Sequence, residues 1–353
     1  MDKKNIYAIT VSFNIDTRKL LFKDSVAYLG SKSYQDEIEI YSNEINISAS
    51  RSSNVKLSNI FYNHNSSLYN QIIKTLAFYY SSTKKFVEIQ SLFITRKRSS
   101  KILDKKKLKK AEINQIIANN FSLSYSLKKD NLSVLFSETE KGKTTLNALT
   151  YLLKANSCEN EDEKFEKLWK SFNQLYRLIG QKNTEFDCLV EIKKFINKNY
   201  ARLNYSTKSV TKLDARELRL PLRWRAMIIN NYDTEKQTKN YRDSILRYSD
   251  HRVMNVYKET LGNREQFLKN KGYYKEVVAH LDNHINAKTI IDNELISVLI
   301  LRYMYFVRNK TFHGEKIDST FRLAINKEIK EFKWLNEKLE PFIIDLINCN
   351  DLY

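Results

Sequence analysis

The chain has 353 residues, of which 42% are hydrophobic and 12% aromatic, with only 6 Gly and 2 Pro. This composition argues against a disordered chain, and the length favours two domains because single cores rarely grow beyond about 250–300 residues. Lys and Arg total 60 against 41 Asp and Glu, a formal charge of +19, which favours a polyanionic partner.

Three further features concern the compartment. Cys158, Cys188 and Cys349 are widely spaced and form no C-x-x-C pair, which favours a reducing compartment and argues against a structural zinc site. The first residues show no export signal. The longest apolar stretch, Leu295 to Val307, has 11 apolar positions in 13 and is shorter than the roughly 18–20 residues of a membrane span. We therefore expect a cytoplasmic protein with no membrane contact.

The first third of the chain shows the period-two alternation of strands, in residues 6–11 and again in 38–41. A helix is predicted over residues 68–80. Residues 121–127 and 132–136 alternate on either side of a polar turn, which predicts a hairpin. Residues 1–140 are therefore expected to form a β-rich domain.

Beyond about residue 140 the apolar residues recur with helical spacing. One stripe follows the i, i+3, i+4, i+7 pattern without interruption: Phe165, Leu168, Trp169, Phe172, Leu175, Tyr176 and Ile179. Gly180 is placed to end this helix. Further helices are predicted over residues 184–199, 222–231, 235–260, 264–285, 290–309 and 319–348, and Pro341 is expected to kink or split the last one. Residues 141–353 should form a helical bundle around the apolar 295–307 helix, so the fold class is α+β.

The apolar helix ends in a group of polar residues that suits phosphate chemistry. Arg308 and Asn309 follow Val307, and His313 follows after four further positions. On an unbroken helix, residues five apart diverge by about 140°, so Arg308 and His313 converge only if the helix ends between them. Gly314 can end a helix in the left-handed conformation, and residues 318–320 offer a cap for the next helix.

Arg308, Asn309 and His313 resemble the signature of the HEPN ribonucleases: an arginine, a polar residue, and a histidine after four intervening positions. The wider strings are similar to the Apea-like HEPN branch of prokaryotic defence and toxin proteins. They are Val307-Arg308-Asn309 with Phe312-His313-Gly314, and Leu168-Trp169, Phe172-Asn173 and Leu175-Tyr176. The resemblance covers about the last 200 residues. It implies an all-α HEPN-like bundle that pairs with a second copy, or with another HEPN domain, to complete one active site.

The residue types fit RNA cleavage independently of that resemblance. RNA carries its own nucleophile, the 2′-hydroxyl, so cleavage needs a base, an acid and positive charge, and no metal or other cofactor. A histidine has an ordinary pKa near ~6.5, so His313 suits proton transfer. Arg308 suits the charge that grows on the phosphoryl oxygens. Asn309 can either orient one of these two side chains or hydrogen-bond the substrate. Lys310 and Lys316 are expected to hold flanking phosphates.

Several other residues have both a functional and a structural interpretation. Asn173 and Tyr176 either line the site or belong to a bundle core. The segment from Arg96 to Lys110 has 9 basic residues in 15, either a nucleic-acid surface or a solvated hairpin or helix face. Its candidate nucleic-acid-binding residues are Arg96, Lys97, Arg98, Lys105, Lys106 and Lys107. No aromatic residue interleaves with this run in sequence, so no base-stacking surface is predicted. His280 and His284 lie four apart on a predicted helix, but no third ligand accompanies them, so no metal site is predicted.

The leading hypothesis is a metal-independent endoribonuclease that cleaves single-stranded RNA by 2′-hydroxyl attack. The resemblance adds a toxin or anti-phage effector role, held in check by a regulatory partner protein or a trigger that is sensed through residues 1–140. Two alternatives stay open: a catalytically inactive HEPN-fold nucleic-acid-binding or scaffold subunit, and the helical partner of a nucleotidyltransferase.

Overall fold

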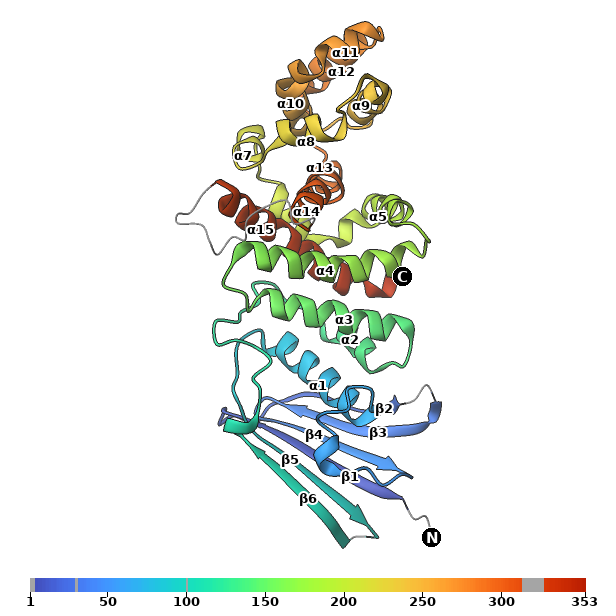
Figure 1. The fold of residues 1–353 in the computed structure, drawn as a ribbon, viewed down its shortest axis with the longest axis vertical. Helices are drawn as coiled ribbons and strands as arrows, with labels where there is room; N and C mark the ends of the chain where they lie inside the picture. The colour runs from blue at the N-terminus through green and yellow to red at the C-terminus, as the bar shows by residue number, and fades with distance from the viewer. Residues whose placement is uncertain (1–3, 29–30, 100, 313–326) are drawn as a thin grey trace. The chain divides into compact units, whose positions relative to one another are not determined.

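A computed structural model describes residues 4–28, 31–99, 101–312 and 327–353 and shows an antiparallel sheet followed by helices (Figure 1). This confirms the predicted α+β class. The chain forms two compact units: unit 1 is Met1–Leu178 with Ile347–Tyr353, and unit 2 is Ile179–Leu346.

The sheet of unit 1 is antiparallel, with strand order β2-β3-β4-β1-β5-β6 among the described residues. Its strands are β1 (Asn5–Phe13), β2 (Leu20–Tyr28), β3 (Ser31–Tyr41), β4 (Glu44–Arg51), β5 (Ile89–Arg98) and β6 (Lys101–Lys109). The alternation predicted for residues 6–11 and 38–41 is confirmed in β1 and β3. Along β1, Tyr7, Ile9 and Val11 are buried, whereas Ile6 is 43% exposed. One face of the sheet therefore carries the core.

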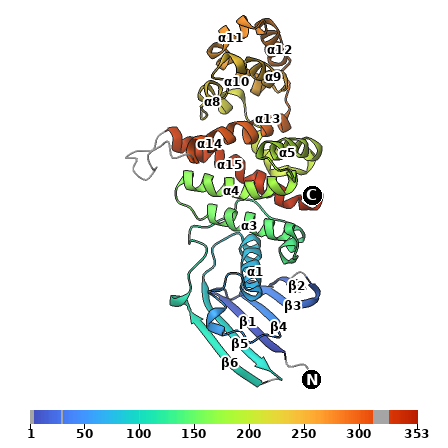
Figure 2. The ribbon, with the colours of Figure 1, turned by 45° about the vertical axis from the view of Figure 1, so that its right-hand side comes forward.

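Helix α1 (Ser67–Thr83) lies over that core face (Figures 1 and 2). Its first turn is capped by Ser66, whose side chain accepts a hydrogen bond from the Tyr69 N–H at 3.1 Å. Tyr79 stacks on Phe13 of β1 with ring centroids 3.9 Å apart, which ties the helix to the central strand. The predicted helix over residues 68–80 is confirmed.

The predicted hairpin between residues 121–127 and 132–136 is wrong. Residues Lys129–Leu132 form the short helix α2, and Ser133–Phe136 continue as the 3-10 turn η3. Leu132, Leu135 and Phe136 are buried, at the i, i+3, i+4 spacing of a helix. A run of five residues is too short to distinguish the helical spacing of apolar residues from the alternation that is typical of a strand.

The rest of unit 1 is helical. Helix α3 (Glu140–Ala155) packs on α1, and α4 (Glu161–Gly180) joins α3 through the Ser171 hydroxyl, which donates to the Ala148 carbonyl at 2.7 Å. The final residues return to this unit, where the Asn348 side chain accepts from the Lys128 N–H at 2.7 Å. The compact units therefore do not divide at residue 140, where strands give way to helices, but at Leu178. The predicted stripe of α4 is buried from Phe165 to Tyr176.

Unit 2 is helical wherever it is described in regular structure. Between residues 185 and 287 its α-helices are α5 (Glu185–Asn199), α6 (Asn204–Val210), α7 (Ala215–Arg219), α8 (Trp224–Asn231), α9 (Thr238–Leu246), α10 (His251–Thr260), α11 (Glu265–Asn270) and α12 (Tyr274–Ala287). The helices predicted over 235–260 and 264–285 are each divided in two. Asp250 caps α10 by accepting from the N–H groups of Arg252 and Val253, and Gly272 takes a positive φ of 73° between α11 and α12.

The predicted central helix is confirmed as a continuous helical run with an internal change of pitch. It comprises α13 (Asp292–Val298), the π-helical segment η7 (Leu299–Met304) and α14 (Tyr305–Phe312). Leu295, Leu299, Tyr303 and Val307 are at most 1% exposed. The last helix, α15 (Lys327–Asn348), continues through Pro341 and is not split by it.

Candidate functional site

Arg308 lies in the last turns of α14 that the structure describes, with a side chain 25% exposed. Its Nη1 donates a hydrogen bond to the Asn309 side-chain oxygen at 2.8 Å. The same nitrogen lies 3.8 Å from Oε2 of Glu185, and the guanidinium carbon lies 5.8 Å from the centre of the Tyr305 ring. Arg308 is thus oriented by neighbours but not enclosed by them.

Glu185 and Tyr305 complete this cluster, and neither was a candidate from the sequence. Glu185 opens α5, whose cap is the Thr184 side chain accepting from the Asp187 N–H at 3.1 Å. The Tyr305 hydroxyl donates to Oε2 of Glu185 at 3.2 Å. Burial and the Glu185 charge raise the pKa of Tyr305, so the phenol stays protonated at neutral pH and keeps its donor.

The sequence contains a local indication of the role of Tyr305 but none for Glu185. Tyr305 precedes Arg308 by three positions, which places both on one face of a helix, so the spacing alone indicates their contact. Glu185 is more than a hundred positions away in the chain, and nothing local to it indicates that α5 begins beside α14. We name the set Tyr305, Arg308, Asn309 and Glu185 the arginine cluster.

The arginine cluster can bind an oxyanion. A guanidinium carries its charge at every pH relevant to the cell and offers paired donors that match two phosphoryl oxygens. The Glu185 carboxylate is 24% exposed, so water screens its attraction for Arg308. A phosphate arriving from solvent therefore competes with Glu185 for the same donors.

Two predicted site residues, His313 and Lys316, lie outside the described residues, as does Gly314. The expected helix end between Arg308 and His313 is therefore not tested. Lys310 lies on α14, two positions beyond Arg308, and is partly exposed.

Asn173 and Tyr176 belong to unit 1, whereas the arginine cluster belongs to unit 2. Tyr176 is fully buried, with its ring 5.0 Å from that of Phe172, which agrees with the core reading left open for it. Asn173 is partly exposed, and its side-chain oxygen accepts from Nε of Arg177 at 2.8 Å.

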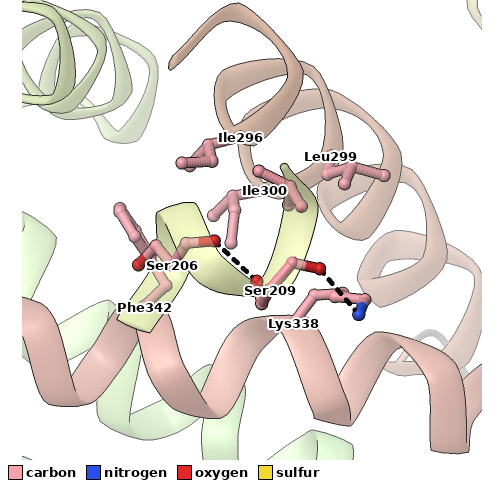
Figure 3. Close-up of a pocket in the computed structure, with 8 residues that line it drawn as sticks. Ser206, Ser209, Ile296, Leu299, Ile300, Lys338 and Phe342 are labelled. Atoms are coloured by element: carbon pink, nitrogen blue, oxygen red, sulfur yellow. Dashed lines mark hydrogen bonds between the residues drawn. The ribbon is translucent and has the colours of Figure 1, made fainter. Parts of the chain in front are cut away.

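The His280–His284 pair and a small pocket of unit 2 lie apart from the arginine cluster in sequence and are built from other residues. The His280 ring lies 2.8 Å from the Tyr248 carbonyl, and no group of three potential metal ligands occurs among the described residues. A small pocket in unit 2 is lined mainly by apolar residues such as Ile296, Leu299 and Phe342 (Figure 3). Its Lys338 ammonium donates to the Ser209 carbonyl at 2.9 Å, and burial lowers the pKa of this lysine.

The basic run forms the hairpin β5–β6. Arg96, Lys97 and Arg98 end β5, and residues Lys105, Lys106 and Lys107 lie in the exposed strand β6. The sequence predicted that no aromatic side chain lies among these basic residues. The structure places one there. Phe93 of β5 pairs with Lys107 of β6 and is 37% exposed, because the hairpin brings together residues that are 14 apart in the chain.

No protein-family model, curated protein or solved structure matches this chain. In the part of the chain that the structure describes, no helix combines the length and the apolar character that crossing a bilayer requires.

Proposed function

We propose that this protein is a HEPN-type, metal-independent endoribonuclease that cleaves single-stranded RNA by attack of its own 2′-hydroxyl. The observation that carries the proposal is the arrangement of Arg308. It is partly exposed on α14, oriented by Asn309 at 2.8 Å, and five positions before His313 in the chain. The reaction requires at least a cation for the phosphate and a histidine for proton transfer, and the chain carries these two residue types five positions apart.

The proposed reaction needs one proton removed and one supplied. His313, or its copy in a second chain, takes the proton from the 2′-hydroxyl as its oxygen attacks phosphorus. The bond from phosphorus to the 5′-oxygen breaks, and a protonated histidine supplies the proton to that leaving oxygen. Arg308 stabilises the charge on the non-bridging oxygens as it grows. The products are a 2′,3′-cyclic phosphate and a 5′-hydroxyl, so atoms and charge balance without a cofactor.

The wider biological role rests on the resemblance to Apea-like HEPN proteins. We propose that two copies, or two HEPN domains, face each other so that one histidine acts as base and the other as acid. A toxin or anti-phage effector of this kind acts in the cytoplasm and is restrained by a partner protein until it is triggered.

The test is cleavage of a fluorescent single-stranded RNA by the purified full chain in EDTA. We expect cleavage, a loss of roughly 10²–10⁴-fold for His313→Ala, and a loss of roughly 10²–10³-fold for Arg308→Ala. Matched controls are His64→Ala and Arg225→Ala, which change exposed residues of the same types. Circular dichroism and melting temperature should be unchanged in all four variants.

The outcomes separate the hypotheses. Equal cleavage by wild type and His313→Ala overturns the assigned site. If the protein binds RNA but cleaves it under no condition tested, the result favours the alternative of a catalytically inactive nucleic-acid-binding or scaffold subunit.

A further inference from the structure

The two faces of the sheet in unit 1 have different roles. The face under α1 carries the core, and the segment after β4 closes over the same side, since the Tyr7 hydroxyl accepts from the Val55 N–H at 2.7 Å. On the opposite face, Ile6 of β1 and Phe93 of β5 are 43% and 37% exposed. Figures 1 and 2 show α1 on one side of the sheet, with β6 at its edge beside β5.

Strand register assigns each basic residue to one of these faces. Because successive side chains alternate, residues paired across strands share a face. Phe93 pairs with Thr10 of β1 and with Lys107 of β6, and Ser91 pairs with Lys109. We define the lysine face by the open-face residues that surround Phe93: Lys97, Lys105, Lys107 and Lys109. Lys106 pairs with the buried Ile94 and so belongs to the opposite face.

Charge on the open face is unevenly balanced. Near β2 and β3, cations are neutralised by close acids: Lys23 lies 2.6 Å from Glu39, and Arg18 lies 2.9 Å from Glu44. Among the described residues, the four lysines of the lysine face form no salt bridge. Asp104, the acid of β6, pairs in register with Arg96 on the other face. Glu112 lies beside one end of this row, where its carboxylate accepts from the backbone N–H of Lys109 at 2.9 Å. The lysine face therefore keeps a net positive charge whose ammonium groups have no side-chain ion pair within the described residues.

We infer that the lysine face binds single-stranded nucleic acid, with Phe93 stacking on a base and the lysines contacting the backbone. Lys105, Lys107 and Lys109 follow one another at about 6.8 Å along the strand, a row that can track an extended polyanion. An exposed ring within such a row offers a stacking surface that accepts any base. The residues beside Phe93 on β1 are small: Ala8, Thr10 and Ser12 leave the ring accessible from that side.

An edge strand rich in lysine also has a simpler explanation. Lysines on an edge strand prevent pairing with the edge of another molecule, and this protection works from either face of the strand. Nucleic-acid binding by the lysine face depends on one face and on an aromatic ring. The two explanations therefore differ in how the two faces respond to the same change of charge.

The experiment measures binding of the full chain to a fluorescein-labelled 12-nucleotide oligouridine in which every ribose is 2′-O-methylated. This probe lacks the nucleophile, so its binding is independent of whether the protein cleaves RNA. The test variant is Lys105→Glu with Lys107→Glu. The matched control is Lys101→Glu with Lys106→Glu, which makes the same change of charge on the same strand but on the other face.

We expect wild-type binding in the micromolar range at physiological salt, with tighter binding to single strands than to a duplex of the same length. The test variant should lose at least about tenfold in affinity and flatten the dependence of log affinity on log salt by about 1.4, whereas the control should lose less than about threefold. Phe93→Ala should lose roughly tenfold, and Phe93→Tyr should retain binding because it keeps the ring.

Three results overturn the inference: no binding by the wild type, equal losses in the test variant and the control, or unchanged binding in Phe93→Ala. Stronger association with anionic phospholipid vesicles than with the oligonucleotide also contradicts it. If both double variants aggregate while their soluble fractions bind the oligonucleotide as wild type does, the inference is wrong. The lysines then serve only to protect the edge of the sheet.

Discussion

Nη1 of Arg308 and Oε2 of Glu185 lie 3.8 Å apart, with each side chain about one quarter exposed. An ion pair this accessible to water contributes at most about 1 kcal/mol. Arg308 is therefore held near an acid by an attraction that a phosphate can replace. In the proposed enzyme, Glu185 acts as a competitor that RNA must displace.

The first prediction concerns this competition. Glu185→Gln removes the charge and keeps the shape, so we expect KM for RNA to fall by up to about fivefold while kcat changes less than twofold. The control is Glu191→Gln on the same helix, whose partner is Lys194 at 2.9 Å. Loss of kcat in Glu185→Gln would instead make Glu185 a participant in the chemistry.

The second prediction concerns Asn309 as a positioning residue. Its side-chain oxygen accepts from Nη1 of Arg308, so Asn309→Ala should leave the guanidinium less well oriented. A misplaced group costs up to roughly 10²-fold in rate, so we expect a fall in kcat with KM nearly unchanged. Steady-state kinetics on a short RNA measure this split, and a change confined to KM contradicts the orienting role.

The third prediction concerns pH and stability. Burial, with Arg247 and Arg302 nearby, lowers the pKa of Lys193 to about 8 from an unfolded value of 10.5. Between these values the unfolded chain binds more protons at this residue than the native one, so its contribution to the free energy of unfolding rises with pH. Below pH 8 the penalty for burying the charge is constant.

Lys193→Gln should therefore raise the free energy of unfolding at pH 7, and this advantage over wild type should shrink as pH approaches 10. Urea unfolding at pH 7, 8, 9 and 10 measures it. Lys194→Gln, which changes a side chain 67% exposed on the same helix, is the control and should show no such trend. A difference between Lys193→Gln and wild type that does not vary with pH contradicts the assignment.

The fourth prediction concerns a buried ion cluster of unit 2. Arg252 is 1% exposed and lies 2.7 Å from both Asp250 and Asp292. Arg252→Met leaves two acids without their partner and should cost about 3–5 kcal/mol in the free energy of unfolding. Arg242→Met removes the exposed pair with Glu276 and should cost far less. Equal losses in the two variants would show that burial does not set the cost.

The fold was predictable where a pattern extends over several turns or is strictly alternating. The stripe from Phe165 to Tyr176 and the alternation of β1 each describe one face of one element, and both are confirmed. The prediction for residues 132–136 was wrong because five residues fit both the helical period of 3.6 and the strand period of two. The breaks at Asp250 and Gly272 were missed because a cap and a positive φ interrupt a helix without interrupting its apolar spacing.

The residues of the candidate site likewise fall into those that local sequence predicts and those that it does not. Arg308 and Asn309 were found because they are adjacent and directly follow an apolar stretch of sequence, which is local information. Glu185 and the pairing of Phe93 with Lys107 depend on contacts between separate elements, and no local spacing predicts those. The role of His313 remains a prediction, since that residue lies outside the described part of the chain.

The most direct test of the central claim is the chemical identity of the RNA ends. Wild-type protein in EDTA, given an RNA with a defined cleavage position, should produce a 2′,3′-cyclic phosphate and a 5′-hydroxyl, detected by mass spectrometry. A single 2′-deoxy substitution at the cleaved nucleotide should abolish cleavage there, because the attacking oxygen is gone. Cleavage that persists at the 2′-deoxy position, or products that carry a 5′-phosphate, would contradict the account.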